Sequence, residues 1–121
     1  LTKLDFVEYI AKKGKPVIFS TGMATFSQVK ETLDLLMEFL EEIVIMQCTS
    51  LYPPTHNQID LNVLDSYKGL IETYPGKRIA LGFSDHCVSN MTSTRSLGPP
   101  SLGAPRARTS MRVLRTPFSI K

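Results

Sequence analysis

Chemically useful side chains follow three short apolar runs of this 121-residue chain. Ser20 ends the run VIFS, Ser50 comes shortly after IVIMQC, and Ser84 and His86 follow RIALGF. Neutral hydroxyls and backbone amides suit a phosphate group, and an imidazole with oxygen ligands suits a divalent cation that polarises a carbonyl. One histidine is not a complete metal site, so at least one further ligand is needed.

Each of these groups also has a purely structural interpretation. Serine, threonine and aspartate often cap helices and form turns, and that interpretation is favoured for Ser20 taken alone. Polar residues that follow three apolar runs in succession favour a binding site over caps and turns. His86, taken singly, is more often a hydrogen-bonded structural histidine, and His56 has no nearby partner in the sequence and is left out. Tyr52 precedes two prolines that stiffen a loop, although a tyrosine over a barrel mouth is also a common sugar contact.

Apolar spacing predicts the elements that position these residues. Residues 17–20 and 43–48 are β-rich runs, apolar on both faces, which predicts strands buried on both sides, and residues 78–83 form a third strand. Helical spacing precedes the first strand, and Thr25 with Gln28 forms a capping box at the start of a second helix. A third helical pattern runs from Leu61 to Ile71, before Pro75 and Gly76.

The order helix, strand, helix, strand, helix, strand predicts an α/β fold. The strands begin ~27 and ~35 residues apart, which is the spacing of right-handed crossover units in a parallel sheet. A doubly wound sheet and a (β/α)8 barrel both satisfy this order. In either fold the carboxyl ends of the strands meet at one edge, so we expect Ser20, Ser50 and His86 to emerge side by side.

The chain joins two different kinds of sequence. Residues 1–94 hold all eleven acidic residues and eight of the fourteen basic ones, for a net charge of −3, whereas the remainder carries +6. Residues 93–121 are rich in arginine and proline and have no sustained apolar period, so we expect an irregular tail. We divide the chain at this point into a folded unit, residues 1–92, and the tail.

The composition also predicts a compartment. The sequence contains no run of ~18 apolar residues, which a membrane span would need, and no charged-then-apolar leader of the kind that marks secretion. Cys48 and Cys87 lack the spacing of a metal-binding pair. We therefore expect reduced thiols and a cytoplasmic location. Because the chain opens on Leu1, already within a helical pattern, we interpret it as a piece of a larger protein.

Three ordered motifs resemble a known family. GKPVIFSTGMAT, QCTSLYP with the later pair Leu61-Asn62, and LGFSDH are similar to consecutive motifs of the sialic acid (N-acetylneuraminate) synthases, which include the legionaminic and pseudaminic acid synthases. The resemblance covers residues 1–92 and implies part of a (β/α)8 TIM barrel. Members condense phosphoenolpyruvate with an N-acylated aminosugar such as N-acetylmannosamine, giving a nine-carbon 2-keto sugar acid and phosphate.

The resemblance also implies roles for particular residues. Ser20 and Ser84 resemble the hydroxyls that hold the phosphate of phosphoenolpyruvate, and Ser50 occupies a neighbouring ligand position. Tyr52 resembles the tyrosine that contacts the sugar. His86 resembles the first of two histidines that bind manganese or magnesium, and a homodimer of the family type is expected.

The chain departs from the family pattern in ways that predict an inactive fragment. The family's lysines and its Glu-Arg-His motif, which holds the second metal histidine, are absent, so no catalytic set is complete. We interpret the tail, from about Ser93 to Arg108 and again near Val113, as the product of a shifted reading frame or of a faulty gene model. Two other classes stay open: another phosphate-binding aldolase-type barrel, and a non-catalytic protein that binds nucleic acid through the basic tail, although we do not expect the latter.

Overall fold

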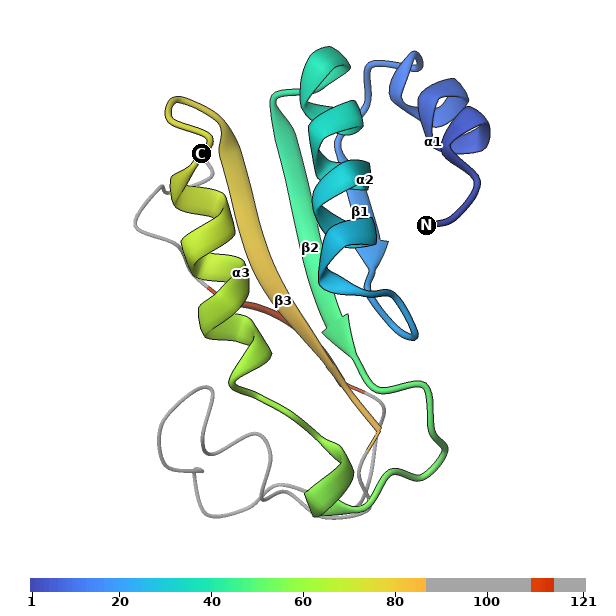
Figure 1. Ribbon diagram of the computed structural model, residues 1–121, viewed down its shortest axis with the longest axis vertical. Coiled ribbons are helices and arrows are strands. Elements are labelled where there is room, and N and C mark those ends of the chain that lie inside the picture. Colours follow the sequence, from blue (N-terminus) through green and yellow to red (C-terminus); the bar gives the residue numbers. More distant parts are fainter. Residues whose placement is uncertain (87–109, 115–121) are drawn as a thin grey trace.

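Helices and strands alternate along most of the chain in a computed structural model that describes residues 1–86 and 110–114 (Figure 1). The predicted order of three helices and three strands is confirmed. The elements are α1 (Leu4–Ala11), β1 (Val17–Ser20), α2 (Phe26–Phe39), β2 (Glu42–Cys48), the 3-10 turn η1 (His56–Gln58), α3 (Val63–Glu72), β3 (Arg78–Asp85) and β4 (Ser110–Leu114).

The first three strands form a parallel sheet in sequence order, β1-β2-β3, as the crossover lengths predict. Ser20 is paired with Met46, and Cys48 is paired with Ser84. The strand β3 runs two residues beyond the predicted end at Phe83. Ser84 therefore lies within the sheet and not in the loop that follows it.

The structure differs from the sequence-based expectation in the tail. The strand β4 lies within the segment expected to be irregular and pairs antiparallel with β3. An edge strand exposes unpaired backbone N–H and C=O groups, and these accept even a short partner. The remaining arginines of the tail, on which nucleic-acid binding depends, lie outside the described residues, as does Cys87.

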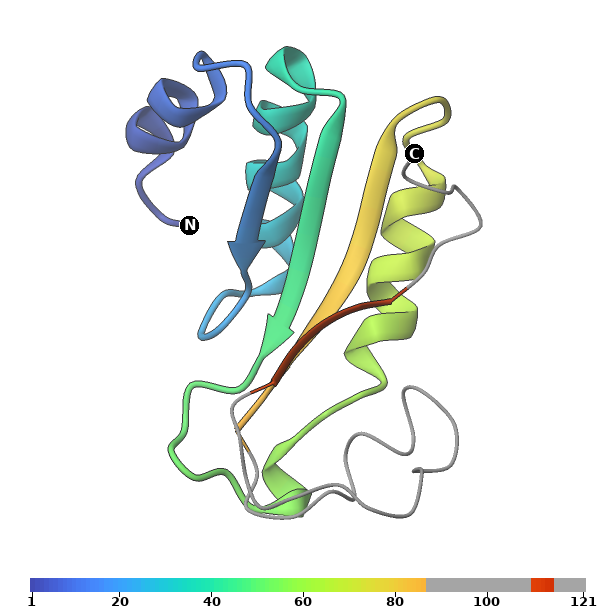
Figure 2. The ribbon, with the colours of Figure 1, turned by 180° about the vertical axis from the view of Figure 1, so that it is seen from behind.

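The helices cover one face of the sheet. The helix α2 lies in front of β1 and β2 in Figure 1 and behind them in Figure 2. Because side chains alternate along a strand, every second residue points toward the helices. The buried cluster on this side contains the strand residues Phe19, Ile43, Ile45, Ile79 and Leu81 and the helix residues Val29, Leu33, Leu36, Met37, Leu40, Tyr67 and Leu70.

The opposite face of β1 is open, and the prediction that this strand is buried on both sides is wrong. Ile18 is 66% exposed, and Ser20 beside it is also exposed. Within the described part of the chain no strand pairs with the outer edge of β1. The apolar side chain of Ile18 is therefore placed for contacts that the described residues do not supply.

Local sequence signals account for where the second helix begins. The Thr25 hydroxyl accepts a hydrogen bond from the Gln28 amide at 3.3 Å, and the Gln28 side-chain oxygen accepts one from the Thr25 amide at 2.9 Å. This reciprocal pair satisfies two donors that a helix start leaves open, so the predicted capping box is confirmed. Among the described residues, no helix has the length and apolar character needed to cross a membrane.

Candidate functional site

The predicted site residues gather at the carboxyl ends of the three parallel strands. Ser20 is level with Met46 and Gly82 in the sheet, and Ser84 lies two residues after Gly82. Because side chains alternate along a strand, Ser20 and Ser84 therefore lie on the same face of the sheet, the one turned away from α2. The two strands that carry them flank β2 and lie about 10 Å apart. Ser20 is exposed, whereas Ser84 is only 8% exposed.

The end of β1 is fastened to β2 by Thr21, a residue to which the sequence analysis assigned no role. Its hydroxyl lies 3.2 Å from the carbonyl oxygen of Met46 and 2.9 Å from the side-chain oxygen of Gln47. Thr21 is 4% exposed, so these bonds form in a largely dry environment. They hold the Ser20-Thr21-Gly22 segment against the end of the second strand.

Ser50 lies directly against the backbone of Gly22. A Cβ atom built on Gly22 would stand 2.3 Å from the Ser50 Oγ and 2.9 Å from the Cys48 Sγ. Both separations are far shorter than a normal van der Waals contact of ~3.5 Å or more. The glycine is therefore required so that the loops after β1 and β2 can approach each other, and the sequence pattern Ser-Thr-Gly was the only signal of it.

A hydrogen-bonded cluster joins three predicted residues: Tyr52 from the loop after β2, Ser84 from strand β3, and His86 just after that strand. The Tyr52 hydroxyl and the Ser84 hydroxyl each lie 3.0 Å from Nε2 of His86. The Tyr52 and His86 rings are also in contact, with centroids 4.4 Å apart. Tyr52 is 75% exposed, so the cluster reaches from the buried Ser84 to the surface. Phenol, imidazole and alcohol are thus held together where a polar ligand could bind.

The described residues do not form a complete divalent-metal site. They contain no group of three or more histidine, cysteine, aspartate or glutamate residues that could hold an ion. His86 offers one imidazole, whose Nδ1 is buried with no hydrogen-bond partner in the described part of the chain. Its Nε2 already has two hydroxyl neighbours. An ion bound here would need most of its ligands from outside these residues.

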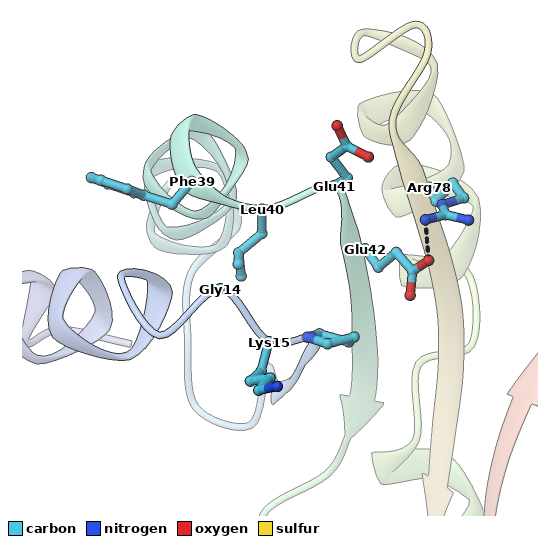
Figure 3. Close-up of a pocket in the computed structure, with 8 residues that line it drawn as sticks. Gly14, Lys15, Phe39, Leu40, Glu41, Glu42 and Arg78 are labelled. Carbon is cyan, nitrogen blue, oxygen red and sulfur yellow. Dashed lines mark ion pairs between the residues drawn. The ribbon is translucent and has the colours of Figure 1, made fainter.

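A cavity lies at the opposite end of the strands, where β2 and β3 begin (Figure 3). It encloses about 490 Å³, and the ion pair between Glu42 and Arg78 lies on its wall. None of the predicted site residues lines it. Because sites in parallel α/β folds form at the carboxyl ends of the strands, this cavity is not the candidate site.

Two groups with shifted pKa values lie between α2 and the end of α3. Burial and a hydrogen bond to Asp34 raise the pKa of Tyr74 to about 12. Hydrogen bonds from Lys30 and Tyr74 lower the pKa of Asp34 below its ordinary value of 3.8. These groups join two helices across their surfaces and do not touch the Tyr52, Ser84 and His86 cluster.

Comparisons with known proteins extend these observations. The family model of the NeuB family matches residues 1–104. An N,N'-diacetyllegionaminic acid synthase of Campylobacter jejuni is 32% identical over 89 residues, covering 71% of this chain and 25% of that protein. A human N-acetylneuraminate-9-phosphate synthase is 30% identical over 81 residues, covering 67% of this chain and 21% of the relative.

A solved structure supports the fold assignment. The N-acetylneuraminic acid (sialic acid) synthetase of Leptospira borgpetersenii, in complex with citrate, superimposes with a TM-score of 0.59 at 23% identity, covering 71% of this chain and 28% of that one. This likeness confirms the expected fold class, three parallel strands with crossover helices from a TIM-type barrel. The chain spans about a quarter of the length of these similar proteins.

Proposed function

The chain belongs to the NeuB family, and on this premise we propose that it carries part of the site of a synthase that joins phosphoenolpyruvate to an N-acylated aminosugar. Two similar proteins are named as synthases of N,N'-diacetyllegionaminic acid and of N-acetylneuraminate 9-phosphate. The product of the proposed reaction is a nine-carbon 2-keto sugar acid, with phosphate as the leaving group. The activity belongs to a longer protein of the length of these relatives.

The observation that carries this proposal is the contact of Tyr52 and Ser84 with His86 at 3.0 Å. These residues come from the loop after β2 and from the end of β3, and only the tertiary structure brings them together. A hydroxyl held on a strand suits the phosphate oxygens of phosphoenolpyruvate, because it donates a hydrogen bond without having to ionise. We assign Ser84 to this role together with Ser20, with Ser50 at the neighbouring position.

The sugar and the metal ion are assigned to the remaining two residues. Tyr52 presents a hydroxyl at the surface of the cluster, where it can bind a hydroxyl group of an aminosugar. His86 provides one nitrogen toward manganese or magnesium, and the other ligands come from outside the described residues. Such an ion acts as a Lewis acid on a carbonyl oxygen. The cytoplasm and a homodimer stay predictions for the longer protein.

By itself the chain is proposed to bind phosphoenolpyruvate weakly and to form no product. The open edge of β1 and the exposed Ile18 leave the barrel interior unenclosed, so water has access to the reacting groups. Catalysis of this kind depends on a preorganised site from which water is excluded. The described residues provide hydroxyls and one imidazole for binding.

Nuclear magnetic resonance on the recombinant chain tests this proposal. Titration with phosphoenolpyruvate is expected to shift the amide signals of Ser20, Ser50 and Ser84, and Ser84→Ala is expected to weaken the binding severalfold. Ser66→Ala, on the exposed surface of α3, is the matched control and should leave binding unchanged. Shifts scattered over the helices, or equal affinity in the two serine variants, would contradict the phosphate assignment.

A parallel assay tests the lack of turnover. The chain is incubated with phosphoenolpyruvate and N-acetylmannosamine in the presence of manganese, and released phosphate is measured. No phosphate above the background without the sugar is expected. Release that depends on the sugar and disappears in the Ser84→Ala variant would show that the chain is active, and the claim of inactivity would be withdrawn.

A further inference from the structure

We propose that β4 is an edge cap on β3, and that without it copies of this chain would join edge to edge into a continued parallel sheet. The strand β4 pairs antiparallel with the part of β3 from Leu81 to Asp85 (Figure 2). The sheet order is β1-β2-β3-β4, so β1 and β4 are its two outer strands. The partner that we infer for the uncovered edge of β3 is a second copy of the chain.

Backbone hydrogen bonds show which groups of β1 face outward. The amide of Thr21, directly after this strand, donates to the carbonyl oxygen of Met46 in β2 at 3.0 Å. Successive residues of a strand direct their backbone groups to opposite sides. Phe19 therefore faces β2 as Thr21 does, whereas the N–H and C=O groups of Ile18 and Ser20 face the outer edge. No strand in the described part of the chain pairs with that edge.

The same alternation assigns the backbone groups at the other edge. The amide of Arg78 donates to the carbonyl oxygen of Glu41 at 2.9 Å, on the side of β2. Phe83 lies at an odd separation from Arg78, so its N–H and C=O groups face β4, where Arg112 is level with it. Arg112 directs its own backbone groups back to β3. Those of the next residue, Val113, face away from the sheet.

Without β4 the two edges of the sheet would be complementary. Both belong to one parallel sheet, so the outer edge of β3 in one copy can pair in parallel with the outer edge of β1 in the next. Ile18, which is 66% exposed, would gain apolar neighbours on the added strands. Because such a contact joins two different surfaces, copies would add head to tail, either closing into a ring or continuing without limit.

With β4 in place, this growth cannot occur. The chain then has one open parallel edge, that of β1, and a strand of four residues offers few backbone groups for pairing. Two copies that met through their β1 edges would leave no parallel edge for a third. Covering an edge in this way is a means by which sheet proteins avoid association through unpaired strands. The edge cap therefore limits the chain to a monomer or a dimer.

Paired proline variants of the whole chain test the edge cap. Arg112→Pro removes an N–H that bonds to β3 and should release β4, whereas Val113→Pro removes one that faces away and should be tolerated. Sedimentation equilibrium is expected to show the parent and Val113→Pro no larger than a dimer. The mass of Arg112→Pro should rise beyond a dimer with concentration. Adding Ile18→Pro, which blocks only the outer edge of β1, should abolish this rise.

Hydrogen exchange at low protein concentration checks the pairing itself. The amides of Leu81 and Phe83, which face β4, should be protected in the parent and lose protection in Arg112→Pro. Those of Gly82 and Ser84, which face β2, should stay protected in both. Unprotected Leu81 and Phe83 amides in the parent would show that β4 does not cover this edge. Loss of protection at Gly82 and Ser84 as well would show that β4 supports the whole sheet and is not a separable cap.

The masses decide the association. An Arg112→Pro mass no larger than that of the parent would overturn the proposal that the uncovered edge joins copies of the chain. Growth that persists after Ile18→Pro is added would also overturn it, because the copies would then be joined without the outer edge of β1.

Discussion

The close approach of Gly22 to Ser50 leads to a prediction that links stability to the site. In Gly22→Ala the new methyl group would lie 2.3 Å from the Ser50 Oγ and 2.9 Å from the Cys48 Sγ, but 3.7 Å from the Ser50 Cβ. The first two distances are too short, and the third is an ordinary contact. Rotation of Ser50 about its Cα–Cβ bond therefore relieves much of the clash, and the hydroxyl is removed from its place in the site.

The magnitude follows from two opposing effects. Overpacking of this kind costs about 1–3 kcal/mol, and replacing glycine with alanine gains about 0.4–1 kcal/mol by restricting the unfolded chain. The net loss in the free energy of unfolding is then about 1 kcal/mol, or a shift of roughly 0.5 M in the urea midpoint. Binding of phosphoenolpyruvate should fall further than stability does, because the displaced hydroxyl is a proposed ligand.

Urea unfolding and the phosphoenolpyruvate titration are measured on the same samples. The matched control is Gly69→Ala, within α3, where an added Cβ meets nothing within 4 Å. Here alanine should stabilise the chain by about 0.5–1 kcal/mol and leave binding unchanged. If Gly22→Ala were stabilised as much as Gly69→Ala, the close approach of the two loops would be refuted.

Three further predictions concern stability away from the site. Neutral Tyr74 has its pKa raised to about 12, so its contribution to stability is complete below pH ~10 and is lost as the pH rises from about 10 to about 12. Tyr74→Phe should remove this loss, and an absorbance titration of the parent should show one of its four tyrosines ionising near 12. Because the pKa of Asp34 is lowered from 3.8, its carboxylate contributes stability that is complete above about pH 4 and is lost as the pH falls through the lowered pKa. In Asp34→Asn the free energy of unfolding should therefore depend less on pH in this acidic range. Thr25→Ala, which removes one half of the capping box, should lower the free energy of unfolding by about 0.5–2 kcal/mol in urea melts, and an unchanged midpoint would argue against the cap.

The order of the elements and the family could both be predicted from the sequence. The predicted strands at residues 17–20, 43–48 and 78–83 are confirmed to within one or two residues, because short apolar runs and helical periods depend on neighbours a few positions away. The parallel direction follows from the lengths of the crossovers. The resemblance carried by the three motifs is confirmed by the match to the NeuB family model.

Other features depended on contacts between distant segments. The hydrogen bond between Tyr52 and His86 joins residues 34 positions apart, and its existence depends on the path of the loop after β2. The open face at Ile18 and the pairing of β4 with β3 depend on which neighbours the sheet has. Neither is encoded in the local pattern of a strand, because the same apolar residues fit a covered face or an open one.

The amino-acid sequence thus determined which segments form helices and strands and which side chains have the chemistry of a phosphate and sugar site. Only the tertiary structure decided that Ser84 lies inside a strand and that Ser50 packs closely against Gly22. It also decided that the Tyr52 hydroxyl is hydrogen-bonded to Nε2 of His86. The physical reason is the distance along the chain over which each kind of interaction acts. Propensity and periodicity act over a few residues along the chain, whereas a hydrogen bond forms wherever the folded backbone brings a donor within about 3 Å of an acceptor.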